Sequence, residues 1–482
     1  MTNMKRFFKL FLAAALLIPA ISISCTSEDD GGGSGGGGEN AVNEWIYEKM
    51  ESWYLWYDEM DNNPNYSLEY KPFFQSLLSD KDGKSSTGGR SYYSYIDRVS
   101  KGTRAGGIFE LTHGLTIRVI PYNNSPVVDL LVLYVMPGSP AANAGIQRGD
   151  RIFNVGGEDL STSNYRQQYP KLLSEAYGVT PQATTVKWYR GSSKTPQGPA
   201  TLNPARMENN PVYICKKIGS TGYLLYDSFE TGGDGHPYDD YLKRSIRNEL
   251  SGITDLVVDL RYNGGGYVSS CRLLASIIAP ADRAGGKFMT RKYNDKHSDQ
   301  TDNFLSITDM QSGSFGPSES GVNLGLNRVY VLTTNASASA SECLIHCLRG
   351  TNVEVIQIGT NTHGKNVGMS GFKSKGEKDF GNYEYEMWPV TFRIYNAKDE
   401  SYTVDGFTPN HSADELSNDD NTLKDLGQLG DPTEEYLAAA LHHIATGSWN
   451  GVRSDTGTRT GAETIEVLDI PILDRGIRHI ED

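Results

Sequence analysis

The sequence has few cysteines, no excess of basic residues and only a short N-terminal apolar run, and each shortage narrows the class of protein. Its 482 residues include five cysteines and carry a formal net charge of −14. An acidic surface repels nucleic acid, so no phosphate-backbone partner is indicated. The apolar stretch 10–20 is shorter than the roughly 20 residues of a membrane-spanning helix. The nine histidines form no convincing metal cluster, so we expect no metal or other cofactor.

The first 24 residues have the features of an export signal. Three basic residues, Lys5, Arg6 and Lys9, surround the start of the apolar stretch, and no acidic residue occurs before residue 25. Removal of this segment would leave a mature chain that begins at Cys25.

Cys25 is the predicted lipidation site. The preceding Ser22-Ile23-Ser24 resembles a bacterial lipobox, although Ser22 stands where leucine is usual. Residues 25–39 are rich in Gly and Ser and would form a tether, and their acidic start resembles the surface-export signal of Bacteroidetes lipoproteins. We expect an exported lipoprotein on the outer membrane or cell surface, with the periplasmic face as the alternative. A plain secretory signal followed by an incidental cysteine is the competing interpretation.

The four other cysteines form an even set, which is compatible with disulfides in an oxidising compartment. Their pairing cannot be deduced from sequence: Cys215, Cys271, Cys343 and Cys347. Cys343 and Cys347 have the spacing of one helix face, which would also suit a metal pair. Cysteine is among the residues most often buried, so we predict buried free thiols at these two positions.

Residues 40–100 are predicted to form a small N-terminal helical domain. Apolar side chains recur every three or four residues over 42–57, and a shorter helix fits 71–78. The aromatic stripe of the first helix could bind a ligand, but a core face is the preferred interpretation. The polar, Gly-rich segment 80–90 is predicted to be a loop.

The segment 101–205 resembles a PDZ domain. Two β-runs at 115–120 and 127–135 precede a helix of small residues ending near Gly145, a turn at 148–150 and another strand. A PDZ domain binds an extended peptide as an added strand and holds its terminal carboxylate on backbone amides. The resemblance assigns the carboxylate-binding loop to His113, Gly114, Leu115 and Thr116. Use of this fold only as a lid or spacer is the alternative.

Residues 206–447 alternate between strand and helix patterns, which predicts an α/β core with a mostly parallel sheet. The predicted strands are 223–226, 255–259, 329–332 and 353–358, and the predicted helices are 238–250, 268–278 and 433–444. The tail 448–482 has little pattern.

Three segments of this core contain residue types suited to acyl-transfer chemistry. The first, Asp259–Gly266, ends in three glycines whose N–H groups could stabilise an oxyanion. The second, Ser337–Glu342, places serines before a helical run, where N–H groups favour negative charge, although serine is also a common N-cap. The third, Thr362–Asn366, contains a Gly-Lys pair after a strand. Each segment alone is a weak signal.

Together the three segments resemble the S41 family of C-terminal processing peptidases in motif and order. The resemblance implies a multidomain protein with an α/β core of the ClpP/crotonase-like kind. It assigns Ser339 as the nucleophile and Lys365 as the base of a serine endopeptidase that cleaves exported proteins near their C-termini. It further implies oxyanion donors at Gly265, Gly266 and Ala340, with support from Glu342 and Thr362. Its partners would be protein or peptide substrates and, through the lipid, the membrane; the oligomeric state is left open.

Two departures from the family pattern leave alternatives open. Met369 stands where many members have glutamine, and Gly350 where some have aspartate, so the group that orients Lys365 is not identified. A serine hydroxyl needs a base, and a lysine can act as one only when burial keeps it neutral. His363 lies two residues away, which keeps a Ser-His hydrolase of the tricorn kind as one alternative. A catalytically inactive lipoprotein that binds peptides or other ligands is the other.

Overall fold

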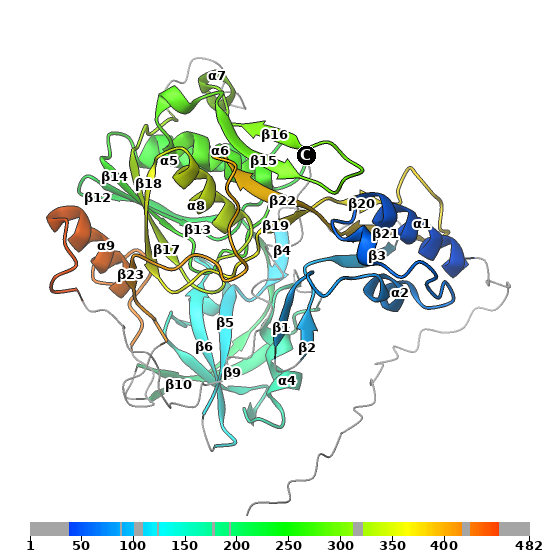
Figure 1. The fold of residues 1–482 in the computed structure, drawn as a ribbon. Coiled ribbons are helices and arrows are strands. Elements are labelled where there is room, and N and C mark those ends of the chain that lie inside the picture. The colour runs from blue at the N-terminus through cyan, green and yellow to red at the C-terminus, as the bar shows by residue number, and fades with distance from the viewer. Residues whose placement is uncertain are drawn as a thin grey trace, which may run out of the picture.

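A computed structural model describes residues 38–86, 89–100, 109–122, 125–175, 179–191, 194–311, 322–416 and 425–452. An α/β core, a β domain (cyan) and N-terminal helices (blue) can be distinguished in Figure 1. This architecture confirms the predicted multidomain class. The expected export signal, Cys25 and nearly all of the tether lie outside the described residues. Within the described ranges, no helix combines the length and apolarity needed to span a bilayer.

The core is built on a six-stranded sheet whose strands, apart from the first, run parallel. The strand order is β12 (Val212–Ile218), β13 (Thr221–Tyr226), β14 (Asp255–Asp259), β17 (Arg328–Thr333), β18 (Glu354–Gly359) and β23 (His411–Ser412). The four predicted core strands are confirmed. Their continuous apolar runs reflect burial on both faces of the sheet.

Helices cover both faces of this sheet. Along β13, Leu224 and Tyr226 point into one apolar cluster, and Tyr223 and Leu225 point into another. The first cluster includes side chains of α5 (Pro237–Glu249), α6 (Val268–Ile278) and α8 (Ala340–Gly350), and the second includes α9 (Glu435–Thr446). The three predicted helices therefore form where expected. Two short helices follow α6: η4 (Ala281–Arg283) and α7 (Ile307–Gln311).

Two smaller sheets flank the core. One has the order β16 (Gln300–Asn303), β15 (Lys287–Lys292), β22 (Val390–Asn396) and β19 (Val367–Met369). The other has the order β20 (Phe372–Lys373), β21 (Tyr383–Trp388) and β3 (Tyr95–Ser100). Because β3 precedes the β domain in the chain and β21 lies almost 300 residues later, their pairing joins the N-terminal part to the core.

The N-terminal part contains both predicted helices, α1 (Gly38–Trp53) and α2 (Tyr70–Ser76), with η1 (Tyr57–Glu59) between them. Their buried side chains share one apolar cluster with Met369, Trp388 and Val390 of the core. The aromatic stripe is therefore a core face, as predicted.

The loop prediction holds for residues 80–83 but is wrong for 84–86 and 89–90, which are strands. Strand β1 (Lys84–Ser86) pairs antiparallel with β2 (Gly89–Ser91). The two strands form an exposed hairpin, so neither face needs apolar side chains and no apolar alternation marks them. Their backbone groups form hydrogen bonds with one another. With β3, this hairpin makes the N-terminal part mixed rather than purely helical.

The β domain is a sheet of order β10 (Thr195–Leu202), β9 (Thr184–Arg190), β7 (Arg151–Val155), β6 (Val128–Val135) and β5 (Leu115–Pro121), with β8 (Glu158–Asp159) on β7. Its helices are α3 (Pro140–Asn143), α4 (Tyr165–Gln168) and η2 (Tyr169–Leu172). The chain enters and leaves it through a pair of antiparallel strands, β4 (Phe109–Thr112) and β11 (Ala205–Glu208). β5 is an edge strand among the described residues.

The four described cysteines are free thiols. Cys343 and Cys347 are fully buried on α8, with their sulfur atoms 3.7 Å apart, as predicted for packed thiols.

Candidate active site

The three motif segments meet at the carboxyl ends of β14, β17 and β18. The hydroxyl of Ser337 donates to the carbonyl of Leu260 at 2.7 Å, and that of Ser341 donates to the carbonyl of Asn263 at 2.9 Å. The N–H of His363 donates to the carbonyl of Ser337 at 2.9 Å. Parallel strands bring these loops to one edge of the sheet, where α/β proteins commonly build sites.

Ser339 occupies a strained turn between β17 and α8. Its φ is 54° and its ψ is −111°, a region that non-glycine residues rarely adopt, and it is the N-cap of α8. Such strain persists only where the surroundings enforce it, and it often marks functional sites. The side chain is 2% exposed and lies at the positive end of the helix dipole.

The buried carboxylate of Glu342 connects the serine segment to the lysine segment. One oxygen, Oε2, accepts the N–H groups of Ser339 at 3.0 Å and Lys365 at 2.9 Å. The other, Oε1, accepts the hydroxyl of Thr362 at 2.7 Å and the N–H of Gly364 at 2.6 Å. Burial raises the pKa of Glu342, and these four donors oppose that effect. A single carboxylate therefore fixes both backbones relative to each other.

Lys365 is fully buried. Its Nζ lies 3.8 Å from the sulfur of Met369 and 5.2 Å from the ring centroid of Tyr93. Burial lowers the pKa of Lys365 to about 8, although the carboxylates of Asp82 and Glu342 favour its charged form. An appreciable fraction of the amine is thus neutral near physiological pH, as a general base requires.

The surroundings of His363 do not favour a role as a base. Burial, together with the positive charges of Lys84 and Lys365, lowers its pKa to about 4. The imidazole is therefore a weak base.

The glycine loop after β14 makes its closest approach to the serine at Gly265. A Cβ on Gly265 would lie 2.7 Å from the Cβ of Ser339, and its φ of 116° suits glycine alone. Its N–H donates to Oδ1 of Asn263 at 2.9 Å. The expected donation from Gly265 to an oxyanion stays a prediction, and the close approach to Ser339 requires a residue without a Cβ at this position. Among the described residues, the N–H groups of Gly266 and Ala340 have no acceptor.

Three family models match this chain. The model of peptidase family S41 covers residues 220–411, that of the peptidase S41 N-terminal domain covers 41–95, and a PDZ domain model covers 131–172. The chain belongs to peptidase family S41. The S41 models include all three segments described above, so sequence and structure lead to the same family.

Similar proteins include two curated relatives and a solved structure. A probable CtpA-like serine protease from Staphylococcus aureus is 23% identical over 243 residues, which is 50% of this chain and 42% of that protein. The carboxy-terminal processing protease CtpB of Bacillus subtilis is 23% identical over 223 residues, 46% of this chain and 41% of that protein. The matches thus span less than half the length of these relatives. A Bacteroides fragilis protein described as an S41 protease is 28% identical with a TM-score of 0.64, covering 84% of this chain and 97% of that one.

The described contacts of residues 113–116, the loop expected to bind a carboxylate, are with the β domain and with Thr112. His113 is buried, with Nε2 3.0 Å from the carbonyl of Gln182, and Gly114 donates its N–H to the hydroxyl of Thr112. Leu115 and Thr116 begin the edge strand β5. No described contact joins these four residues to Ser339 or Lys365.

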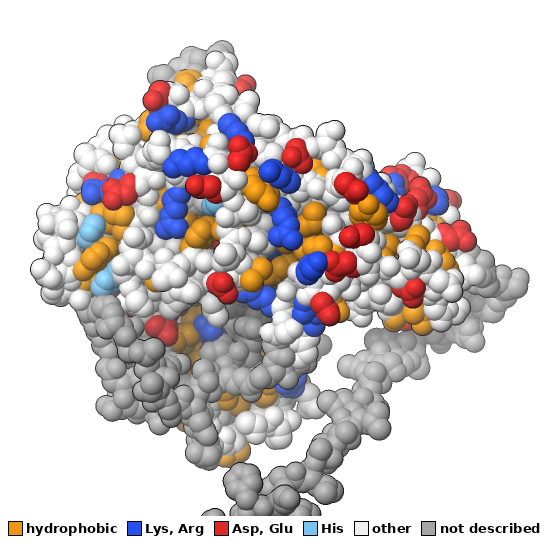
Figure 2. Space-filling view, in the orientation of Figure 1, with side chains coloured by type: hydrophobic (Ala, Val, Ile, Leu, Met, Phe, Trp, Pro, Cys, Tyr) orange, Lys and Arg blue, Asp and Glu red, His pale blue; other side chains and the backbone are white. Residues whose placement is uncertain are grey.

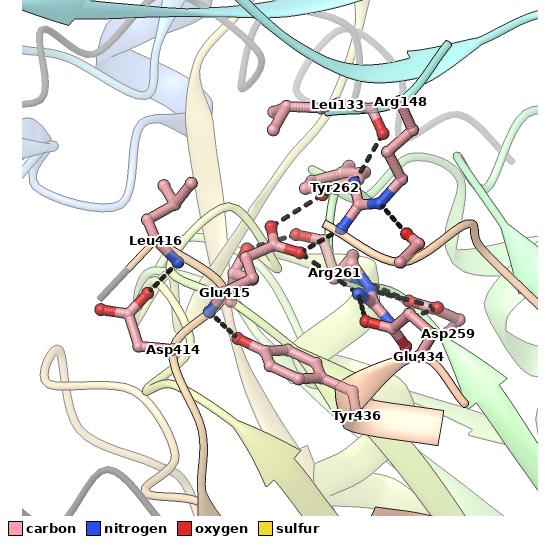
Figure 3. A network of polar contacts seen from close by, with 12 residues as sticks. Leu133, Arg148, Asp259, Arg261, Tyr262, Asp414, Glu415, Leu416, Glu434 and Tyr436 are labelled. Atoms are coloured by element: carbon pink, nitrogen blue, oxygen red, sulfur yellow. Dashed lines mark hydrogen bonds and ion pairs between the residues drawn. The ribbon is translucent and has the colours of Figure 1, made fainter. Parts of the chain in front are cut away.

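A buried ion network links the PDZ domain to the S41 core (Figure 3). Arg148 of the PDZ turn pairs with Glu415 at 2.6 Å and donates to the hydroxyl of Tyr262. Arg261 pairs with Glu415 at 3.2 Å and with Glu434 at 2.7 Å. Arg261 and Tyr262 lie in the motif segment after β14, so this network also supports the base of the glycine loop.

Sequence reasoning missed three residues of the S41 site. Asn263 was seen only as part of its motif, whereas Asp82 and Tyr93 lie in the N-terminal part, where no pattern pointed to chemistry. Asp82 and Tyr93 lie outside the three segments that carry the family resemblance.

Proposed function

We propose that this chain is a serine endopeptidase that cleaves exported proteins near their C-termini through a Ser339–Lys365 dyad. The carboxylate of Glu342 carries the proposal, because its Oε2 atom accepts the N–H groups of both residues. The low pKa of the buried amine supports the same roles.

In the proposed reaction, Oγ of Ser339 attacks the scissile carbonyl carbon while Nζ of Lys365 takes the hydroxyl proton. The N–H groups of Gly266 and Ala340 stabilise the resulting oxyanion. When the C–N bond breaks, the Lys365 ammonium returns its proton to the leaving amine. Lys365 then takes a proton from a water molecule that attacks the acyl carbon. When the bond from that carbon to Oγ breaks, the Lys365 ammonium returns the proton to Oγ, which releases a carboxylic acid and regenerates Ser339 with a neutral Lys365.

The substrate's C-terminus is proposed to bind along β5 with its carboxylate in the loop formed by residues 113–116. The position of β5 at the edge of its sheet, as far as the described residues show it, supports this proposal, because an extended peptide can add to an edge as a strand. We further propose that the enzyme is held at the outer membrane or cell surface by a lipid on Cys25, as the signal sequence suggests.

The dyad is tested by pH–rate profiles of three variants on an unstructured protein substrate. We expect no turnover by Ser339→Ala or Lys365→Ala, and measurable turnover by His363→Ala. Wild-type activity should rise with pH through about 8, because the neutral amine is the active form. Activity that persists in Lys365→Ala but disappears in His363→Ala would favour a Ser-His enzyme instead.

A further inference from the structure

A tyrosine from the N-terminal part of the chain lies against the proposed base. Tyr93 sits between β2 and β3, and its side chain is 7% exposed. Its ring centroid is 5.2 Å from Nζ of Lys365. The buried hydroxyl of Tyr93 has no described hydrogen-bond partner, so no polar contact explains its place. Contact with the amine is made by the ring.

The backbone of Tyr93 is fixed by a buried carboxylate. Asp82 accepts the N–H groups of Tyr93 at 3.0 Å and Ser94 at 3.1 Å, as well as the hydroxyls of Ser94 and Tyr54. The Ser94 hydroxyl in turn accepts the N–H of Val390 at 2.8 Å. The ring is therefore positioned by contacts to both the N-terminal part and the core.

The groups around the amine explain why shielding matters. Glu342 on α8 and Asp82 in the N-terminal part favour the charged amine, whereas His363 is held neutral by burial and by the charges of Lys84 and Lys365. The positive charge of Arg90 acts on Tyr93, where it opposes the rise in the pKa of the hydroxyl that burial causes. The sulfur of Met369 contacts the amine. The pKa of Lys365 falls to about 8 despite the two carboxylates, so exclusion of water outweighs their attraction.

We propose that Tyr93 is a positioning residue for the base: its ring shields Nζ of Lys365 from water, and the N-terminal part thereby completes the active site. This inference rests on the proposed function. Within the described residues, Tyr93 and Met369 both lie beside Nζ of Lys365.

The test compares the pH dependence of kcat for Tyr93→Gln and Tyr93→Phe. Glutamine brings a polar amide and water to the amine and should move the rising limb to higher pH by about one unit, with an approximately tenfold loss at pH 7 that is recovered in alkali. Phenylalanine keeps the ring and should retain the wild-type limb. The control is Tyr385→Ala, which removes another buried tyrosine of the same apolar cluster and should not move the limb.

A limb that stays in place in Tyr93→Gln, or that moves equally in Tyr385→Ala, would overturn the proposal. If Tyr93→Gln does not fold, Tyr93→Ala replaces it with the same expected shift. Turnover by the Ser339→Ala variant would instead contradict the proposed function, so the two failures are distinguishable.

Discussion

At the scale of single residues, the burial that suits Lys365 to its proposed role as a base also has a cost in stability. The unfolded chain holds a lysine of ordinary pKa near 10.5, whereas the folded site lowers that pKa to about 8. The unfolded state therefore binds more protons between these values, and the contribution of Lys365 to stability rises with pH across this window. At pH 7 the protonated amine costs about 3 kcal/mol of folding free energy.

Replacing Lys365 by methionine should stabilise the protein while abolishing turnover. We expect the free energy of unfolding at pH 7 to increase by about 1–3 kcal/mol, because methionine needs no proton or hydration. The difference from wild type should shrink above pH 10. Urea unfolding at both pH values measures it, with Lys187→Met, an exposed lysine on β9, as the control that should gain nothing. A destabilised Lys365→Met protein at pH 7 would contradict this account.

At the scale of elements, local patterns predicted most of the structure. The buried strands of the core and helix α6 lie where continuous apolar runs and helical spacing placed them. The environment of Lys365 was inaccessible to the same reasoning, because Asp82 and Tyr93 reach it across more than 270 residues of chain and have no local periodicity. The hydrogen bond from the N–H of Gly265 to Oδ1 of Asn263 could not be anticipated from composition either.

The PDZ edge strand gives an element-scale prediction about substrate ends. Using Ser339→Ala protein to prevent cleavage, a peptide with a free C-terminal carboxylate should bind more tightly than its amidated form. Gly114→Ala should remove this preference, because the added Cβ would lie 2.2 Å from the Cβ of Ser139 and distort the loop. Gly138→Ala is the matched control, since Gly138 has a similar positive φ but open space around it. Equal affinity of the wild-type loop for both peptides would leave the PDZ domain as a lid.

At the scale of the whole molecule, buried ion pairs hold the PDZ domain against the core. Burial alone would raise the pKa of Glu415, but the attraction of Arg148 and Arg261 holds that pKa at about 2. Because this value is below the ordinary one, the stabilisation is complete above about pH 4.5 and is lost as pH falls towards 2. Figure 2 shows charged side chains of both signs on the molecular surface, and ion pairs between such solvated groups contribute much less.

Arg148→Met should therefore destabilise the protein by about 3–5 kcal/mol at pH 7, because Glu415 would remain buried with fewer partners. Arg206→Met removes an exposed pair with Glu175, whose atoms lie 2.7 Å apart, and should cost at most about 1 kcal/mol. Urea unfolding of both variants measures the contrast. Equal effects would show that burial does not distinguish the two pairs.

The proposed lipid on Cys25 also concerns the whole molecule, since it determines where the enzyme works. Cys25→Ala should move the protein from the membrane fraction to the soluble fraction after cell lysis. Unchanged membrane partition of Cys25→Ala would contradict the lipid anchor.

Glu342 has a consequence for the evolution of this site. Its carboxylate accepts hydrogen bonds from the backbone N–H groups of Ser339 and Lys365, and not from their side chains. Either reactive side chain can then be lost by a single mutation while the loops keep their shape. Proteins descended from such a chain could persist as pseudoenzymes that bind substrates without cleaving them. In the laboratory, the Ser339→Ala protein would serve as a substrate trap.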